Sequence, residues 1–460
     1  MAMVPGAKRR RLGEDEEEEL VEDRISRLPD GVLGDIVSLL PTKDGARTQV
    51  LSSRWRHLWR AAPLNFDLSG HPAADVSRIL AAHPGPCRRF SFNMFRVNYN
   101  EYSTVKANLD SWLLSPSLNN VQELEFLLGT LDNPPPLLPA PVRRFSPTLR
   151  VATFERCSFP DSALHLPLLQ QLSLVRVRIS ETSLHALLVG CSVLESLLLV
   201  NNNGFLPRLQ IVSASLRSIG VASRLGDDRL KQLIIEDAPC LERLLFFETS
   251  EIVFQDSGMD ISVISAPRLR ILGGISSKLP RLQFGTTTFQ GASMVSLTTV
   301  VHSVKVLALS YVTLSLDVVI DLIKCFPCLE KLYIQTDELG EKNTWCRKYQ
   351  NLIGTFDIRL KKIVVSCYRG NKSHVNFAKF FVSNAPVLES MRFEIQDRNI
   401  NCVWIERQHR LLQIENRASR DAQFYFVSRN KSIESFISLQ TRPEQVHDLS
   451  TVDLFERIYN

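Results

Sequence analysis

Apolar residues recur at the spacing of an α-helix between residues 28 and 40. Pro29 stands where a first helical turn tolerates a missing N–H, and Pro41 ends the pattern before a polar turn at 42–45. We therefore expect a helix with one apolar face over this stretch. The positions on that face are Leu28, Val32, Leu33, Ile36, Val37 and Leu40.

A second helical stretch follows, and Pro63 ends it. Its apolar residues are expected to share one face, with arginines at 54, 56 and 60 between them. They are Val50, Leu51, Trp55, Leu58 and Trp59. A core this small cannot cover so many bulky side chains, which indicates that a partner covers some of them.

A repeat runs through the chain from residue 147 onward. Each copy holds Pro-x-Leu or a close variant, followed by alternating apolar residues such as LESLLLV at 194–200. The leucines of the clearest copies are Leu149, Leu169, Leu194, Leu241, Leu269, Leu329 and Leu388, and weaker copies start near Leu216, Val304 and Leu360. The irregular spacing of roughly 20 to 35 residues lies near the range of leucine-rich repeats.

One such unit cannot bury its own apolar face, whereas stacked units bury their leucines in one continuous core. Helical returns are expected at 184–188 and 316–325. The asparagine expected late in a regular repeat is mostly missing, so we expect an irregular solenoid. The predicted fold is α/β: a small N-terminal helical unit followed by this solenoid, with parallel strands on its concave face.

Two regions carry little regular pattern. Residues 1–21 pair a basic run, Lys8, Arg9, Arg10 and Arg11, with an acidic run at 14–19, and we expect a disordered tail. The basic run is either a nuclear-localisation signal or only a solvated part of that tail. Residues 70–145 are hard to read, apart from a helix near 105–114 and an extended Pro-rich loop at 133–141.

Composition narrows the classes of function. The 460 residues carry 54 basic and 49 acidic side chains, a balance that argues against a dedicated nucleic-acid binder. No apolar run is long enough to span a bilayer, and no apolar stretch follows the basic run as it would in a secretory signal. The nine cysteines are scattered and odd in number, so reduced thiols in the nucleus or cytoplasm are expected.

Candidate catalytic and metal-binding residues are few. Cys325-x-x-Cys328 has no second pair to complete a zinc site, and Cys240 shares the repeat position of Cys328, so buried inert cysteines are expected. The histidines show no metal-ligand spacing, and no phosphate-binding loop, hydrolase elbow or zinc-protease motif appears. We expect no metal, no cofactor and no enzymatic activity.

The string DRISRLPDGVLGDIVSLLPTKDGARTQVLSSRWRHLWR, residues 23–60, resembles the plant F-box pattern over its whole length. The resemblance implies that residues 22–68 dock onto a Skp-type adaptor, and through it onto a cullin, by laying apolar helices into a groove. Membrane and nucleic-acid partners are not expected. The residues predicted to contact the adaptor are Leu28, Pro29, Ile36, Leu40, Pro41, Val50, Leu51 and Trp55.

Residues 356–395 resemble the FBD domain that follows leucine-rich repeats in many plant F-box proteins. The matching features include Leu360-Lys361-Lys362-Ile363, Tyr368-Arg369-Gly370 and Ala385-Pro386-Val387-Leu388-Glu389. The later strings RASRDAQF and HDLSTVDLF are similar to the tails of grass members of this family. The expected domains are a tail at 1–21, an F-box at 22–68, a linker and start of repeats at 69–145, repeats at 146–350, an FBD-like part continuing the solenoid at 351–425, and a tail at 426–460.

The resemblance implies the substrate-recognition subunit of an SCF-type, cullin-based ubiquitin ligase, located in the nucleus or the cytoplasm. The alternative is a leucine-rich-repeat scaffold that does not engage a ligase. Strand periodicity places the side chains between the inward leucines on the opposite, substrate-facing side. The predicted substrate-binding residues are Ser196, Leu198, Arg243, Phe247, Lys331, Tyr333 and Gln335.

Overall fold

The computed structural model describes most of the chain. The described residues are 25, 27–67, 71–83, 86–129, 134–161, 164–203, 207–222, 230–247, 259–276, 281–290, 293–296, 299–312, 314–336, 357–395, 401–428, 446–449 and 455. The predicted basic run and acidic tail therefore lie outside the described residues.

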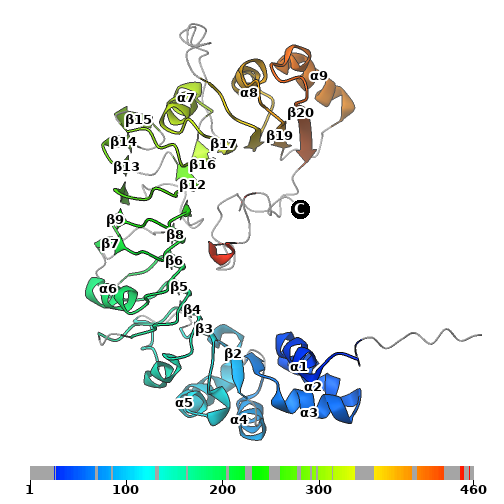
Figure 1. The fold of residues 1–460 in the computed structure, drawn as a ribbon, viewed down its shortest axis with the longest axis vertical. Helices are drawn as coiled ribbons and strands as arrows, with labels where there is room; N and C mark the ends of the chain where they lie inside the picture. The colour runs from blue at the N-terminus through cyan, green and yellow to red at the C-terminus, as the bar shows by residue number, and fades with distance from the viewer. Residues whose placement is uncertain are drawn as a thin grey trace, which may run out of the picture.

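A fourteen-stranded parallel sheet forms the inner surface of an open arc (Figure 1). Its strands, in spatial order, are β1 (Leu64–Asp67), β2 (Cys87–Asn93), β3 (Glu123–Leu127), β4 (Val151–Glu155), β5 (Gln171–Val175), β6 (Ser196–Val200), β8 (Ser218–Ala222), β10 (Arg243–Phe246), β12 (Ile271–Ser276), β16 (Val306–Val312), β17 (Lys331–Thr336), β18 (Lys362–Ser366), β19 (Ser390–Ile395) and β20 (Gln423–Ser428). The α/β solenoid with strands on its concave face is thus confirmed. The array begins earlier than the repeat pattern indicated, because residues 64–127 already supply three strands.

The outer surface of the arc carries the return segments. They include the helices α4 (Ala73–Ala82), α5 (Tyr102–Leu113), α6 (Glu181–Val189), α7 (Leu316–Cys325), α8 (Lys372–Asn384) and α9 (Cys402–Leu412) (Figure 1). The predicted helices at 105–114, 184–188 and 316–325 are therefore present. Between α6 and α7 a six-stranded sheet takes the place of helices, with strands β7 (Arg208–Val212), β9 (Gln232–Asp237), β11 (Asp260–Val263), β13 (Arg281–Phe284), β14 (Thr287–Gln290) and β15 (Ser293–Ser296).

The repeat leucines fill one continuous core between the two surfaces. All seven leucines of the clearest repeats are buried, none more than 4% exposed. In most copies the leucine N–H donates to the carbonyl three residues earlier, as Leu241 does to Ala238 and Leu329 to Phe326. This turn sets the direction of each strand, so a local motif repeated along the chain produces the register of the whole sheet.

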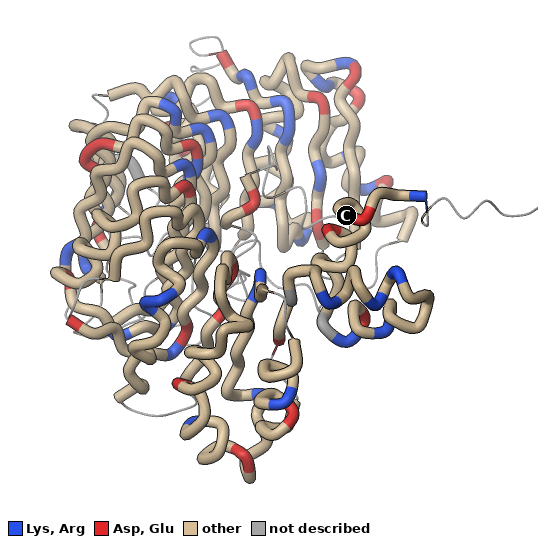
Figure 2. Tube along the Cα trace, turned by 60° about the horizontal axis from the view of Figure 1, so that its bottom comes forward, with Lys and Arg blue, Asp and Glu red and all other residues tan. Residues whose placement is uncertain are grey.

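Charged residues alternate between neighbouring repeats. Arg217 pairs with Glu242 at 2.6 Å, and Lys305 pairs with Glu330 at 2.7 Å. Figure 2 shows basic and acidic positions interspersed along the repeats. Exposed pairs of this kind contribute about 0.2–1 kcal/mol each, so they adjust the register rather than hold the fold.

Four short helices form the N-terminal unit, at one end of the arc (Figure 1). They are α1 (Asp30–Leu39), α2 (Thr42–Arg47), the 3-10 turn η1 (Thr48–Val50) and α3 (Ser53–Ala61). Pro29 caps α1, and the chain turns extended at Leu40, just before Pro41. Arg54 ties α3 to the start of α1, through the Asp30 carboxylate at 2.7 Å and the Leu28 carbonyl at 2.5 Å.

Candidate functional site

The N-terminal unit has a small but complete core. Leu33, Val37, Leu58 and Ala62 are buried against one another, and Trp55 joins them at 9% exposure. Trp55 was predicted to meet a partner, but in the free chain its side chain lies in this core. Its role here is to hold α3 against α1.

Several large apolar side chains stay outside that core. Ile36 is 41% exposed, Leu39 66%, Leu51 67% and Val50 87%. We call these four the exposed F-box residues. Leu39 was not among the predicted contacts, although it lies within the helical segment that the apolar pattern indicated.

The expectation that Val50 and Leu51 share a face with Trp55 is wrong. Ser52 is extended, with φ −167° and ψ 173°, so the helical stretch is broken between Leu51 and α3. Helical periodicity cannot pass through such a break, and the two residues point away from the core instead. Among the other predicted contacts, Leu28 and Leu40 are half-buried, while Pro29 and Pro41 are exposed.

The concave face of the solenoid is the second candidate surface. Side chains alternate along its strands as predicted: Leu197 and Leu199 enter the main core, and Leu198 and Val200 belong to a separate cluster on the other side of the sheet. Phe247 and Tyr333 belong to the same second cluster. Six of the seven predicted substrate-facing residues are nevertheless buried, and only Lys331 is half-buried.

The chain's own residues Val446–Leu449 and Phe455, which we call the concave segment, lie against this face. Val446 and Phe455 are 0% and 1% exposed, and both belong to the second cluster. Figure 1 shows residues from this part of the chain inside the arc, far from the solenoid's outer helices. A predicted tail thus occupies the place where a substrate was expected.

His447 is held between two strands of the sheet. Its Nε2 lies 2.6 Å from the Ser173 hydroxyl of β5, and its Nδ1 lies 2.6 Å from the Ser196 hydroxyl of β6. A neutral imidazole has one donor and one acceptor nitrogen, and a serine hydroxyl can serve either one. Both ring nitrogens are therefore satisfied without a charge.

Arg243 of β10 holds the backbone of the concave segment. Its guanidinium donates to the carbonyl oxygens of Asp448, at 2.5 Å, and of Leu449, at 3.3 Å. Ser218 of β8 donates to the Val446 carbonyl at 3.0 Å. Phe455 packs against Tyr333 of β17, with ring centroids 5.1 Å apart. Serine, arginine and tyrosine from five strands thus converge on one short stretch of chain.

Docking of the concave segment should weaken in acid. Burial lowers the pKa of His447 from 6.5 to about 4, so protonation favours the released segment, whose imidazole has its ordinary pKa. The equilibrium constant for docking has its full value above about pH 6.5. Below that it falls by up to about tenfold per pH unit, down to about pH 4. Fluorine NMR of 4-fluorophenylalanine at Phe455 would report the docked and released populations.

The control for this measurement is His447→Gln, which keeps a donor and an acceptor but does not titrate. Burial and Arg369 also lower the pKa of His374 to about 4, so overall stability alone would not separate the two histidines. Docked populations that fall equally with pH in the parent and in His447→Gln would contradict the assignment to His447.

The Tyr368-Arg369-Gly370 motif has a structural role. Tyr368 is 1% exposed, packs against Phe393 with ring centroids 4.5 Å apart, and donates to the Gln408 side chain of α9 at 3.0 Å. Gly370 has φ +66°, and a Cβ there would lie 2.5 Å from the Gln408 amide nitrogen. The motif therefore locks α9 onto β18 and β19, and completes the end of the solenoid.

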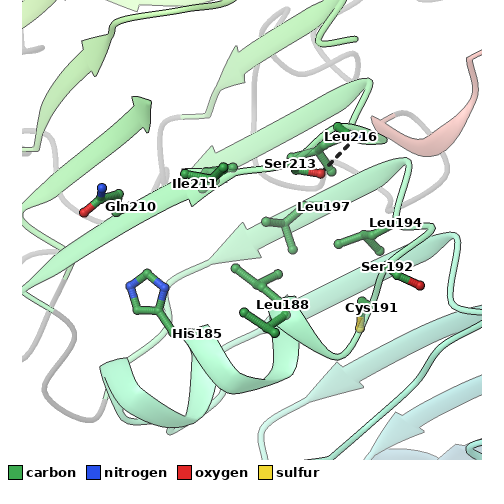
Figure 3. Close-up of a pocket in the computed structure, with 13 residues that line it drawn as sticks. His185, Leu188, Cys191, Ser192, Leu194, Leu197, Gln210, Ile211, Ser213 and Leu216 are labelled. Carbon is green, nitrogen blue, oxygen red and sulfur yellow. Dashed lines mark hydrogen bonds between the residues drawn. The ribbon is translucent and has the colours of Figure 1, made fainter. Parts of the chain in front are cut away.

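A hollow of about 510 Å³ lies on the convex side, between α6 and β7 (Figure 3). Leu188, Leu194 and Leu197 line it, with His185 and Gln210 at its other end. It carries none of the predicted site residues, and among the described residues that line it there is no Asp, Glu, Lys or Arg.

The cysteines of the predicted Cys-x-x-Cys pair differ in environment. Cys325 is buried, and burial raises the pKa of its thiol to about 12, so it stays protonated. Cys328 and Cys240 are half-buried. Within the described residues no group of three or more His, Cys, Asp or Glu side chains is placed to hold a metal ion. Nor does any helix of the described chain combine the length and apolarity needed to cross a bilayer.

Comparisons with known proteins match three parts of the chain: the N-terminal unit, the repeats of the solenoid and the region near its C-terminal end. Family models match for the F-box domain over residues 25–67, for the LRR repeats of FBD-associated F-box protein At5g56370 over residues 109–334, and for FBD over residues 350–393. The first and last of these lie where the F-box and FBD resemblances were seen.

Individual relatives come from Arabidopsis thaliana. The putative F-box/FBD/LRR-repeat protein At4g00315 is 31% identical over 214 residues, covering 43% of this chain and 47% of the relative. F-box/LRR-repeat protein At3g03360 is 32% identical over 203 residues, covering 42% and 40% respectively. The match thus spans less than half the length of these relatives. With its F-box, leucine-rich repeats and FBD domain, the chain belongs to the plant F-box/FBD/leucine-rich-repeat proteins.

Proposed function

We propose that this chain is the substrate-recognition subunit of an SCF-type ubiquitin ligase. The observation that carries the proposal is the combination of a complete F-box core with large apolar side chains left outside it. Val50 and Leu51 lie outside the F-box core and expose most of their apolar surface. Apolar residues of this size are stabilised when a partner covers them, and for an F-box that partner is a Skp-type adaptor, bound in turn to a cullin.

The arrangement of the two surfaces supports the same role. The F-box stands at one end of the arc, and the concave face lies along its inside (Figure 1). An adaptor on the F-box would therefore leave the concave face to a protein substrate, once the concave segment that lies there is displaced. The chain would do no bond chemistry itself; it would raise the concentration of a substrate lysine near the ubiquitin-conjugating enzyme. Such a receptor would work in the nucleus or the cytoplasm.

Co-purification with a Skp-type adaptor tests the proposal. The parent chain should form a complex, and Leu28→Ala with Pro29→Ala should reduce its yield at least about tenfold. A matched control is Leu137→Ala with Pro139→Ala in the solenoid, where Leu137 is 68% exposed. A parent chain that binds no adaptor would leave the alternative, a repeat scaffold that does not engage a ligase.

A further inference from the structure

The concave segment occupies the solenoid as a ligand occupies a groove. Its contacts come from β5, β6, β8, β10, β12 and β17, and the hydrogen-bonded partners lie 205 to 274 residues apart in the sequence. None of these contacts is needed to close the main core, whose residues form a separate cluster on the other side of the sheet.

The groove has distinct places for side chains and for backbone. Val446 belongs to one apolar cluster with Leu198 and Phe247, while His447 lies between two serine hydroxyls. Arg243 donates hydrogen bonds to two consecutive backbone carbonyls, and Phe455 packs against Tyr333. Along the groove the subsites therefore bind, in order, an apolar side chain, a neutral polar side chain, the backbone and an aromatic ring.

Two glycines make room for the concave segment. A Cβ on Gly220 would lie 3.0 Å from a Val446 methyl carbon, and a Cβ on Gly273 would lie 2.7 Å from the Phe455 ring. Both glycines stand on the concave side, where neighbouring strands carry Leu198, Leu245 and Tyr333. The face is thus hollowed at the two points where the apolar side chains of the segment rest.

We propose that the concave face is a peptide-binding groove, that the concave segment is its resident ligand, and that a partner peptide must displace it. The partner is a protein segment with the same chemistry: an apolar residue, a neutral histidine directly after it, and a phenylalanine at the spacing of Phe455. This proposal does not depend on adaptor binding, because the groove and the F-box are separate surfaces.

The test frees the groove by cutting the full-length protein after it has folded. A protease site is inserted between Asn430 and Lys431, outside the described residues, and a fluorescent peptide of residues 441–460 is added before and after cleavage. Before cleavage the resident segment competes at an effective concentration in the mM range, so little peptide should bind. After cleavage and dilution the peptide should bind saturably, and unlabelled peptide should displace it. Equal binding, or none, in both states would overturn the proposal.

Point variants identify the groove as the binding place. Arg243→Ala loses the two carbonyl contacts, and Gly273→Ala places a methyl group under Phe455; each should weaken peptide binding at least about tenfold. Arg208→Ala is the matched control, because Arg208 is exposed on β7, in the outer sheet. Peptide affinity unchanged in both groove variants would overturn the assignment.

A second route avoids cleavage, in case the cut chain unfolds. Val446→Asp with Phe455→Asp in the intact chain places two charges against the apolar cluster and should release the segment. The wild-type peptide should then bind this variant but not the intact parent. Failure of the peptide to bind the variant, with its circular dichroism spectrum unchanged, would contradict the proposal independently of the first test.

Discussion

A chain with aspartate at both Val50 and Leu51 should lose its affinity for a Skp-type adaptor by at least about 100-fold while its fold stays intact. The two side chains are 87% and 67% exposed, so their replacement should change the free energy of unfolding by no more than about 0.5 kcal/mol. In a complex, however, both carboxylates would have to be buried against apolar surface. Isothermal titration calorimetry with the adaptor and a thermal melt of the free chain measure the two effects separately.

The control pair for this variant lies on the solenoid. Val189→Asp with Val212→Asp changes two valines that are 82% and 66% exposed, and it should leave adaptor affinity unchanged. Trp55→Ala should behave differently, because it removes a buried indole from the F-box core and lowers the free energy of unfolding by about 3–5 kcal/mol. In this variant, lost adaptor binding should be accompanied by a loss of helical circular dichroism signal. Unchanged affinity in the double aspartate variant would contradict the placement of the adaptor on the exposed F-box residues.

Gly274→Ala should destabilise the solenoid by about 2–5 kcal/mol. Gly274 lies in β12 with φ +82°, and a Cβ there would be 1.9 Å from the Phe246 carbonyl oxygen of β10. Backbone atoms cannot move aside as the end of a side chain can, so the strand itself must shift. The register between β12 and β16 already slips at this point, between Gly273 and Ile275.

Urea unfolding followed by circular dichroism measures this loss. Gly34→Ala is the control, because nothing lies within 4 Å of a Cβ at that position in α1. It should be neutral or stabilising by up to about 1 kcal/mol. A free energy of unfolding for Gly274→Ala within about 0.5 kcal/mol of the parent would show that β12 accommodates a side chain there.

The apolar periodicity predicted helices and strands correctly where the structure of a segment depends mainly on its own residues. The helices at 184–188 and 316–325 and the strand within 194–200 follow from spacing, because each presents one apolar side to the same core. The same reasoning failed at Val50 and Leu51, because one extended residue, Ser52, ends the periodicity. In residues 70–145 the turn before β3 carries Asn119-Asn120-Val121 in place of Pro-x-Leu, so this strand could not be read in advance.

The occupied concave face could not be predicted from periodicity. Alternation correctly separated Ser196 and Arg243 from the inward leucines, but their partners lie more than 200 residues later in the chain. The string HDLSTVDLF, residues 447–455, drew attention only as a family likeness, and it proves to contain all of the concave segment except Val446. The likeness of this string to grass members stays a prediction.

Amide hydrogen exchange of the full chain, alone and with a Skp-type adaptor, shows directly where the adaptor binds. Docking of the adaptor on the exposed F-box residues predicts new protection within residues 25–67, strongest near Ile36 and Leu51, and unchanged exchange at residues 446–449. Protection of the solenoid without protection of the F-box, or no protection anywhere at saturating adaptor, would contradict it.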